Sequence, residues 1–285
     1  MTRTARSRKH RGFDLDARLA QVEGAIEREP ASWRGRWRTW GAAGASDAGA
    51  DWASVRVDLG CGKGDFVIAS ALAHPDTLYV GLDWEAVCLM HGAEKALAAG
   101  VPNVVFALDD EPHLDALFAP GEVDGIHLNF PTPFPRKKET AKRLTFAPRF
   151  LEYAAVLASG GQVFLRTDSD PFLQYTKTQL ELARWTIDWE TDDCRAALPD
   201  EPASEYERKL SAQGARVLAI KARPGAYPQP QASELAQSAP QSLFDYLPDD
   251  LDSMEYVPHG MVGGVTNRRN HNHNVAPKRA AKQHR

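Results

Sequence analysis

Short apolar segments with strand character alternate with helical patterns from about residue 54 to residue 221, and this alternation constrains the fold most strongly. Parallel strands need long crossover connections, so regular strand–helix–strand alternation predicts a mainly parallel sheet with helices on both faces. The expected strands are 55–59, 78–82, 104–108, 125–130, 162–166 and 217–221, and the expected helices are 66–73, 85–99, 112–118, 147–158 and 171–183. We therefore predict an α/β, Rossmann-like, doubly wound fold whose ligands bind at the carboxyl ends of the strands.

The two ends of the chain differ in composition from this domain, which we place at residues 51–223. Residues 1–50 are predicted to form a basic N-terminal arm and linker, with a helix over 14–28. The arm contains the tryptophans Trp33, Trp37 and Trp40 among arginines. They either stack on exposed bases or anchor the arm. Pro, Gln, Ala and Ser dominate after residue 223, so residues 224–285 are expected to be a low-complexity, mostly disordered tail in which 243–251 form a short apolar patch able to dock.

Charge and cysteine usage exclude several classes of protein. The formal net charge is −4, but the basic residues gather in patches at both ends of the chain and after residue 135. Cys61, Cys88 and Cys194 form no C-x-x-C pair, which argues against a disulfide framework and a zinc site. No apolar run approaches the ~20 residues of a membrane helix. We expect a cytoplasmic protein without a metal or a membrane span.

A glycine turn with nearby acids marks the expected ligand site. Gly60, Gly62 and Gly64 follow the first strand and precede a helix. This spacing fits either a turn that a ligand approaches closely or one that merely requires positive φ. The acids that end the first three strands are Asp58, Asp83 and Asp110, with Asp109 as an alternative to the last. Three carboxylates disfavour a pyrophosphate but suit S-adenosylmethionine, which carries a sulfonium, an ammonium and a ribose diol. The pattern therefore favours methyl transfer over hydride transfer.

A proline-rich and then basic loop follows the fourth strand. Pro131, Pro133 and Pro135 end this strand because proline lacks an amide donor. The cations that follow are Arg136, Lys137, Lys138, Lys142 and Arg143. Such a run is either a solvated face or a set of phosphate contacts that adds salt-dependent RNA affinity.

Four further residues have structural alternatives to a functional role. Asp168 ends the fifth strand, where it serves a substrate or caps the next helix. Ser204 and Glu207 fit a capping box, S-x-x-E, at the start of a helix. His127 lies in a core strand, which favours packing over catalysis.

In their order and spacing these motifs resemble the bacterial tRNA (guanine-N7-)-methyltransferase family over about residues 30–223. The features that carry the resemblance are residues 57–64, 81–83, 120–123, 129–145, 160–161, 167–168 and 204–214. The resemblance implies a sheet of the class I methyltransferase type, S-adenosylmethionine as cofactor, and transfer of its methyl group to N7 of a tRNA guanine.

The same resemblance implies roles for individual residues. The cofactor residues would be Asp58, Gly60, Gly62, Gly64, Asp83, Asp110 and Thr132, and the guanine would meet Arg136, Lys137, Asp168, Ser204, Glu205, Tyr206 and Glu207. Asp168 and Thr132 are the catalytic candidates, but Thr132 stands where the family has an aspartate, and Phe134 replaces a tryptophan.

The threonine at position 132 leaves three functions open. Guanine N7 carries a free lone pair, so methyl transfer needs alignment rather than removal of a proton, and an enzyme remains our expectation. The alternatives are a non-catalytic RNA-binding relative and a methyltransferase with another target base. The choice of tRNA, the oligomeric state and the role of the tail stay open at this point.

Overall fold

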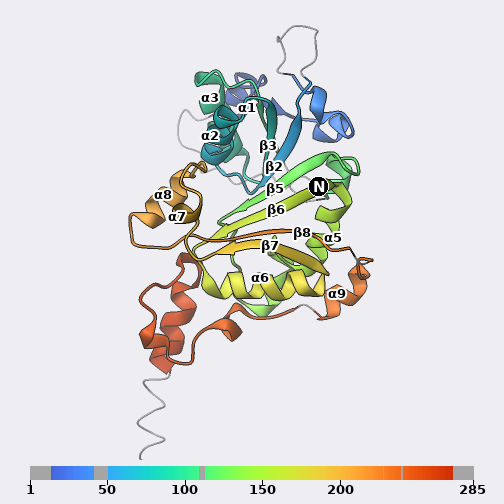
Figure 1. Cartoon of the computed structure of the whole chain (residues 1–285). Helices are drawn as coiled ribbons and strands as arrows, with labels where there is room; N and C mark the ends of the chain where they lie inside the picture. Colours follow the sequence, from blue (N-terminus) through green and yellow to red (C-terminus); the bar gives the residue numbers. More distant parts are fainter. Residues whose placement is uncertain (1–13, 42–50, 109–112, 227, 239, 272–285) are drawn as a thin grey trace, which may run out of the picture.

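The computed structural model describes residues 14–41, 51–108, 113–226, 228–238 and 240–271, which build one eight-stranded sheet flanked by helices (Figure 1). The strands are β1 (Ile26–Glu27), β2 (Ser54–Leu59), β3 (Thr77–Asp83), β4 (Val104–Leu108), β5 (Val123–Asn129), β6 (Leu157–Thr167), β7 (Trp185–Thr191) and β8 (Leu218–Pro224). The six expected strands are all present, and β1 and β7 are additions at the two edges.

The sheet has the strand order β1-β4-β3-β2-β5-β6-β8-β7. Strand β8 runs antiparallel to both neighbours, and every other pair is parallel. The prediction of a doubly wound, mainly parallel sheet is confirmed, and the antiparallel strand next to the edge is the arrangement of the class I methyltransferase fold. The chain order reverses between β2 and β5, so a crevice for ligands is expected beyond their carboxyl ends.

Helices cover both faces of the sheet because successive strand side chains alternate between two cores. The α-helices are α1 (Leu15–Ala20), α2 (Asp65–Ala73), α3 (Ala86–Ala98), α4 (Leu114–Leu117), α5 (Ala147–Val156), α6 (Asp170–Leu182), α7 (Cys194–Ala197), α8 (Glu205–Ser211) and α9 (Ala232–Ser238). Short 3₁₀ helices are η1 (Pro30–Trp33), η2 (Trp37–Thr39), η3 (Lys137–Lys142), η4 (Leu243–Tyr246), η5 (Leu251–Ser253) and η6 (His259–Met261). Tyr79 and Phe106 pack beneath α2 and α3, whereas Leu78 and Val105 belong to the larger core shared with α5 and α6.

The described part of the N-terminal arm is docked on the domain. The expected helix over 14–28 is shorter than predicted, because α1 ends at Ala20 and Ile26 pairs with Phe106 of β4 in the sheet. Trp37 is completely buried, and its Nε1 donates a hydrogen bond to the Leu117 carbonyl at 2.8 Å. The tryptophans Trp37 and Trp40 therefore anchor the arm, because neither presents a ring surface to a base.

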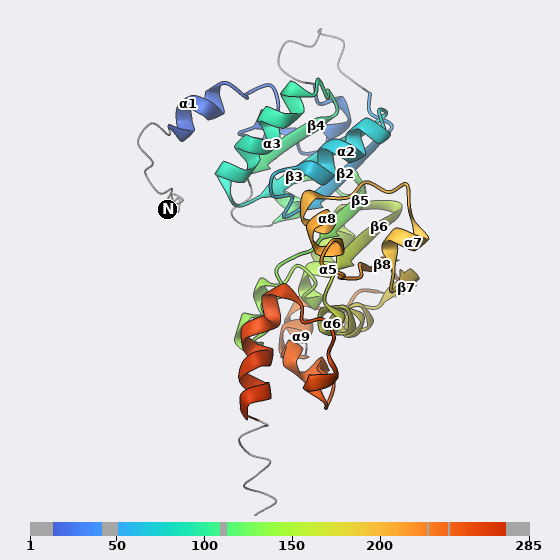
Figure 2. The same cartoon turned by 90° about the vertical axis from the view of Figure 1, so that its left-hand side faces the viewer.

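The C-terminal segment, residues 228–238 and 240–271, is folded, which corrects the expectation of a mostly disordered tail. Its buried apolar residues are Leu235, Leu243, Leu251, Met261 and Val265. All except Leu251 belong to the larger core, and α6 packs on η4. Residues 262–271 form a further helix beyond α6 (Figures 1 and 2). The composition misled because these few apolar residues, too sparse to fold alone, find partners on a core that already exists. Residues 272–285 lie outside the described part.

Candidate active site

Two adjoining cavities open near the carboxyl ends of β2, β3, β5 and β6. The central cavity has a volume of ≈ 480 Å³ and the side cavity one of ≈ 540 Å³, and small-molecule sites commonly measure about 300–1,000 Å³. The walls shared by both cavities are Gly60, Phe130, Pro131 and Thr132. A ligand that lies along Gly60 can therefore occupy both.

Asp58 lines the central cavity from the end of β2 and is almost completely buried. Asn129 Nδ2 donates a hydrogen bond to Asp58 Oδ1 at 3.0 Å, which joins the ends of β2 and β5. Burial raises the pKa of Asp58 to about 7, although this hydrogen bond and the charge of Arg166 lower it. Asn129 Oδ1 is buried and finds no hydrogen-bond partner among the described residues. The two side chains favour a cationic hydrogen-bond donor in this corner of the cavity.

The three glycines of the turn have two different roles. Gly60 and Gly62 have φ values of +75° and +55°, both line the central cavity, and a Cβ at either would meet nothing within 4 Å. A ligand can therefore approach their backbone closely. Gly64 lines neither cavity, and a Cβ there would lie 2.5 Å from Phe106 Cζ. Its glycine requirement comes from its φ of +72° and from the close packing of α2 against β4.

Asp83 ends β3 and lines the side cavity. Its Oδ2 accepts a hydrogen bond from the Gly62 amide at 2.8 Å, and its Oδ1 accepts one from the Glu85 amide at 2.9 Å. The carboxylate thus fixes the glycine turn against β3. Each oxygen keeps a second lone pair, which is what a ribose diol requires.

The loop after β5 has strained backbone on either side of Thr132. Phe130 and Phe134 have φ values of +51° and +42°, conformations that cost non-glycine residues on the order of 1–3 kcal/mol each. Arg143 holds the loop by donating through Nε to the carbonyls of Pro133 and Phe134, both at 3.1 Å. Arg143 is completely buried, so it is a structural residue and not part of an exposed basic face. Strain maintained in this way is common at ligand sites.

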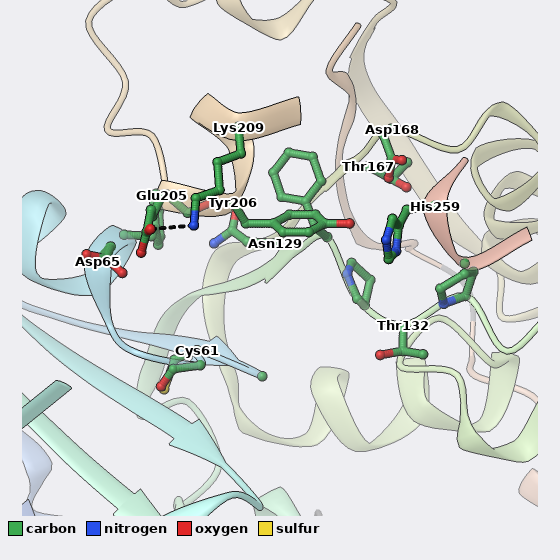
Figure 3. Close-up of a pocket in the computed structure, with 18 of the residues that line it drawn as sticks. Cys61, Asp65, Asn129, Thr132, Thr167, Asp168, Glu205, Tyr206, Lys209 and His259 are labelled. Carbon is green, nitrogen blue, oxygen red and sulfur yellow. Dashed lines mark hydrogen bonds and ion pairs between the residues drawn. The ribbon is translucent and has the colours of Figure 1, made fainter. Parts of the chain in front are cut away.

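Asp168 is half-buried and lines the central cavity together with Thr132 (Figure 3). The capping alternative for Asp168 is excluded, because Ser169 Oγ accepts the capping hydrogen bond from the Phe172 amide at 3.3 Å. Asp168 Oδ2 instead accepts a hydrogen bond from the Tyr256 hydroxyl at 2.6 Å. Its other oxygen is available to a ligand in the cavity.

The start of α8 forms the wall opposite. The residues of this wall are Ser204, Glu205 and Tyr206. Ser204 Oγ caps α8 by accepting from the Glu207 amide at 3.0 Å, but the capping box is only half made. The Glu207 carboxylate is 1% exposed and forms ion pairs with Arg195 at 2.6 Å and Arg166 at 3.6 Å. These ion pairs hold the start of α8 in place from the side away from the cavity. Glu207 therefore does not line the cavity, although the sequence predicted that it would contact the substrate.

The basic loop borders the cavities from outside. Arg136, Lys137 and Lys138 are exposed and line neither cavity, whereas Lys142 lines the side cavity. Within the described part of the chain, none of these four residues forms an ion pair with an acid. A row of cations without acidic partners, at the rim of a site, is suited to phosphate groups.

The C-terminal segment supplies site residues that the sequence did not predict. Pro258, His259 and Gly260 line the central cavity, and Figure 3 shows the His259 side chain there. No motif or periodicity marks them. The available signal was the few apolar residues around them, but the composition of residues 224–285 had led us to assign this whole stretch to the tail.

The remaining candidates do not extend the site. Asp110 and its neighbour Asp109 lie outside the described residues. His127 is buried against the rings of Phe66 and Phe164 and lines neither cavity, as a packing residue should. In the described ranges, no three metal-ligating side chains form a cluster, and no helix has the length and apolar character to cross a membrane.

Comparison with known proteins assigns the family. The family model described as "Putative methyltransferase" (Methyltransf_4) matches residues 53–220. The tRNA (guanine-N(7)-)-methyltransferase of Lactococcus lactis subsp. cremoris strain MG1363 is 30% identical over 72% of this chain and 92% of its own length. Those of Geobacillus kaustophilus and Streptococcus thermophilus strain CNRZ 1066 are 32% and 30% identical, over 68% and 76% of this chain and 86% and 98% of theirs. The chain belongs to the tRNA (guanine-N7-)-methyltransferase family.

Proposed function

We propose that this protein transfers a methyl group from S-adenosylmethionine to N7 of a guanine in tRNA. The observation that carries the proposal is a pair of joined cavities with different chemistry at their walls. The central cavity offers Asp58 and Asn129 to a cationic group, and its other walls offer polar and aromatic groups to a base. The side cavity offers Asp83 to a diol and has Lys142 of the basic loop at its wall. S-adenosylmethionine, when bound, supplies a methyl carbon activated by the sulfonium.

The cofactor would be held by the turn and the ends of β2, β3 and β5. Asp58 and the buried Asn129 Oδ1 accept hydrogen bonds from its ammonium group. The open backbone of Gly60 and Gly62 receives its middle part, and Asp83 accepts hydrogen bonds from the ribose hydroxyls. Asp110 remains a proposed adenine contact by family resemblance only.

The target guanine would enter the central cavity from the side of α8. Asp168 accepts hydrogen bonds from the guanine N1–H and amino group and balances the positive charge that develops on the purine. Thr132 offers one hydroxyl at the shared wall of the two cavities. Tyr206, whose ring meets Phe130 edge-on at 5.4 Å, presents an aromatic face to an unstacked base. Glu207 acts indirectly, through the position of α8.

No proton has to leave guanine N7 before attack, so the chain's own residues chiefly align three atoms: N7, the methyl carbon and sulfur. The rigid loop around Thr132 and the buried charges behind α8 serve this alignment. Arg136, Lys137, Lys138 and Lys142 are the proposed phosphate contacts that bring the tRNA to the cavity. We also propose a cytoplasmic location, because a tRNA substrate is found there and Cys61, Cys88 and Cys194 are free thiols.

The decisive experiment is mass spectrometry of nucleosides from tRNA incubated with the protein and a labelled methyl donor. We expect labelled 7-methylguanosine. A different labelled nucleoside would indicate another target base. If the natural chain forms no 7-methylguanosine and Thr132→Asp restores it, the protein is a non-catalytic RNA-binding relative.

A further inference from the structure

The C-terminal segment is fastened to both loops that enclose the central cavity. The Leu243 amide donates to the Pro135 carbonyl at 3.0 Å, and Arg143 Nη1 donates to the Gln241 carbonyl at 2.9 Å. On the other side, Ser169 Oγ donates to Met261 Sδ at 3.6 Å. These contacts bind the segment to the loop after β5 and to the loop after β6. The matched family residues end at 220, so this fastening lies outside the family pattern.

Gly260 brings the segment into direct contact with the cavity wall. A Cβ at position 260 would lie only 2.5 Å from Pro133 Cγ, so a larger residue would push the chain away. The close approach sets the neighbouring His259 at the cavity, where its exposed imidazole shares the wall with Thr132, Asp168 and Tyr206 (Figure 3). A neutral imidazole offers one hydrogen-bond donor and one acceptor.

Tyr256 from the same segment controls the orientation of Asp168. Its hydroxyl donates to Asp168 Oδ2 at 2.6 Å, a length typical of a charge-assisted bond. Burial, and next this hydrogen bond to the carboxylate, raise the pKa of Tyr256 well above its usual value, so the phenol keeps its proton and acts as a donor. The bond restrains rotation of the carboxylate and leaves Oδ1 for a ligand.

We propose that the C-terminal segment is a working part of the substrate site: His259 contacts the target nucleobase, and Tyr256 positions Asp168 against it. The inference rests on the proposed function and adds two residues to it. His259 presents a donor for guanine O6 or an acceptor for its N–H groups, on a wall where residue 132 carries no charge. Tyr256 acts through Asp168 and is a positioning residue.

His259 is tested by His259→Ala in the full chain, with His271→Ala as the matched control. His271 lies in the same segment and outside the central cavity. We expect His259→Ala to lower kcat/KM for tRNA by about tenfold or more, chiefly through kcat, with S-adenosylhomocysteine affinity and melting temperature unchanged. His259→Asn, which keeps a donor and an acceptor, should recover part of the rate. His271→Ala should match the natural chain.

Tyr256 is tested by Tyr256→Phe, with Tyr246→Phe as control, because Tyr246 also uses its hydroxyl within the segment but hydrogen-bonds Gln241 and Thr178 away from the cavity. We expect Tyr256→Phe to lower kcat/KM about fivefold to twentyfold. Added to Asp168→Asn, it should lower the rate no further, because its effect passes through the Asp168 carboxylate. A purely structural tyrosine would give the same fold-change in both backgrounds.

The outcomes separate this inference from the proposed function. If the natural chain forms no 7-methylguanosine, the proposed function fails. If the natural chain is active, and His259→Ala and Tyr256→Phe are as active as their controls, the function stands and the inference is overturned.

Discussion

The proposed cofactor side and the proposed substrate side of the candidate active site are assembled in different ways. The proposed cofactor side comes largely from residues 58–62 and Asp83, which belong to two adjacent strands and to the turn that follows β2. Asn129 joins them from the end of β5. The proposed substrate side combines four separate stretches of the chain, residues 130–133, 167–168, 204–206 and 258–260. One side is local in sequence, and the other exists only when distant segments meet.

This difference predicts different sensitivities. The cofactor side is secured by backbone hydrogen bonds to Asp83 and by ladder pairing between β2 and β3. The substrate side depends on buried side chains that lie outside it, such as Arg143, Glu207 and Leu243. Substitutions at residues distant in sequence from the site should therefore weaken substrate recognition more readily than cofactor binding.

The largest expected effect comes from the anchor of the C-terminal segment. Leu243 is completely buried in the larger core, so Leu243→Ala should lower the free energy of unfolding by about 2–5 kcal/mol. Val262→Ala, at a half-exposed site in the same segment, should stay within about 0.5 kcal/mol. Urea unfolding measures both. Equal stability of the two variants would mean that the segment adds nothing to the fold.

The next effect concerns catalysis alone. Asp168→Asn should lower kcat/KM for tRNA by at least about 10²-fold, or ~2.7 kcal/mol of transition-state stabilisation, while S-adenosylhomocysteine binding is preserved. Asp170→Asn is the control, because Asp170 is exposed two residues away and lines neither cavity described above. Steady-state kinetics and calorimetry together provide the measurement. If Asp168→Asn weakened cofactor binding as well, Asp168 would not belong to the substrate side alone.

A pH effect of similar size should be confined to the cofactor side. The pKa of Asp58 is raised to about 7, and only its ionised form attracts the ligand's ammonium. Affinity for S-adenosylhomocysteine should therefore rise with pH, by roughly a hundredfold from pH 5 to pH 8 if the carboxylate is essential. Calorimetry across this range should show that the affinity rises with pH in the natural chain and does not change with pH in Asp58→Asn. A flat profile in the natural chain would remove Asp58 from the ammonium site.

The raised pKa of Asp58 makes stability and cofactor affinity change in opposite directions with pH. Because folding raises the pKa of Asp58, the folded state binds the extra proton between about pH 4 and pH 7. Ionisation of this group therefore reduces the free energy of unfolding as pH rises through that window. Asp58→Asn should lose this contribution and gain stability relative to the natural chain above pH 7.

A smaller effect is expected at Asp83. Asp83→Ala should weaken S-adenosylhomocysteine binding by about 1–3 kcal/mol, because the ribose hydroxyls and two backbone amides lose an acceptor. Asp192→Ala, at a side chain that is 80% exposed, is the control. Isothermal calorimetry decides the matter, and unchanged affinity would exclude Asp83 from the cofactor site.

The smallest effect per residue belongs to the basic loop. Replacing Lys137, Lys138 and Lys142 by alanine should lower tRNA affinity and flatten its dependence on salt by roughly one unit of slope per lost phosphate contact. Cofactor binding should survive. Lys177→Ala, at an ion pair with Glu190, serves as the control. Filter binding at several salt concentrations is the measurement, and an unchanged slope would identify the loop as a solvated face.

The sequence alone determined the sheet and the glycine turn of the proposed cofactor side. Alternating apolar strands and helices predicted six of the eight strands, because each is a continuous local pattern. The glycine turn and Asp83 were predictable for the same reason: the residues that make the site also make the turn. The edge strands were missed. β1 has only two residues, and the β7 side chains are mostly half-buried or exposed, so no continuous apolar run marks that strand.

Only the tertiary structure decided the substrate side. Identical residue types took different roles according to burial: Arg143 became a core residue while Arg136 stayed exposed, and Glu207 turned inward while Glu205 faced the cavity. Trp37 filled the core, which decided between the base stacking and the anchoring that the sequence had left open. His259 reached the cavity only because Gly260 fits against Pro133, 127 residues away along the chain. Such contacts depend on which surfaces meet after folding, and no local pattern of residues records that meeting.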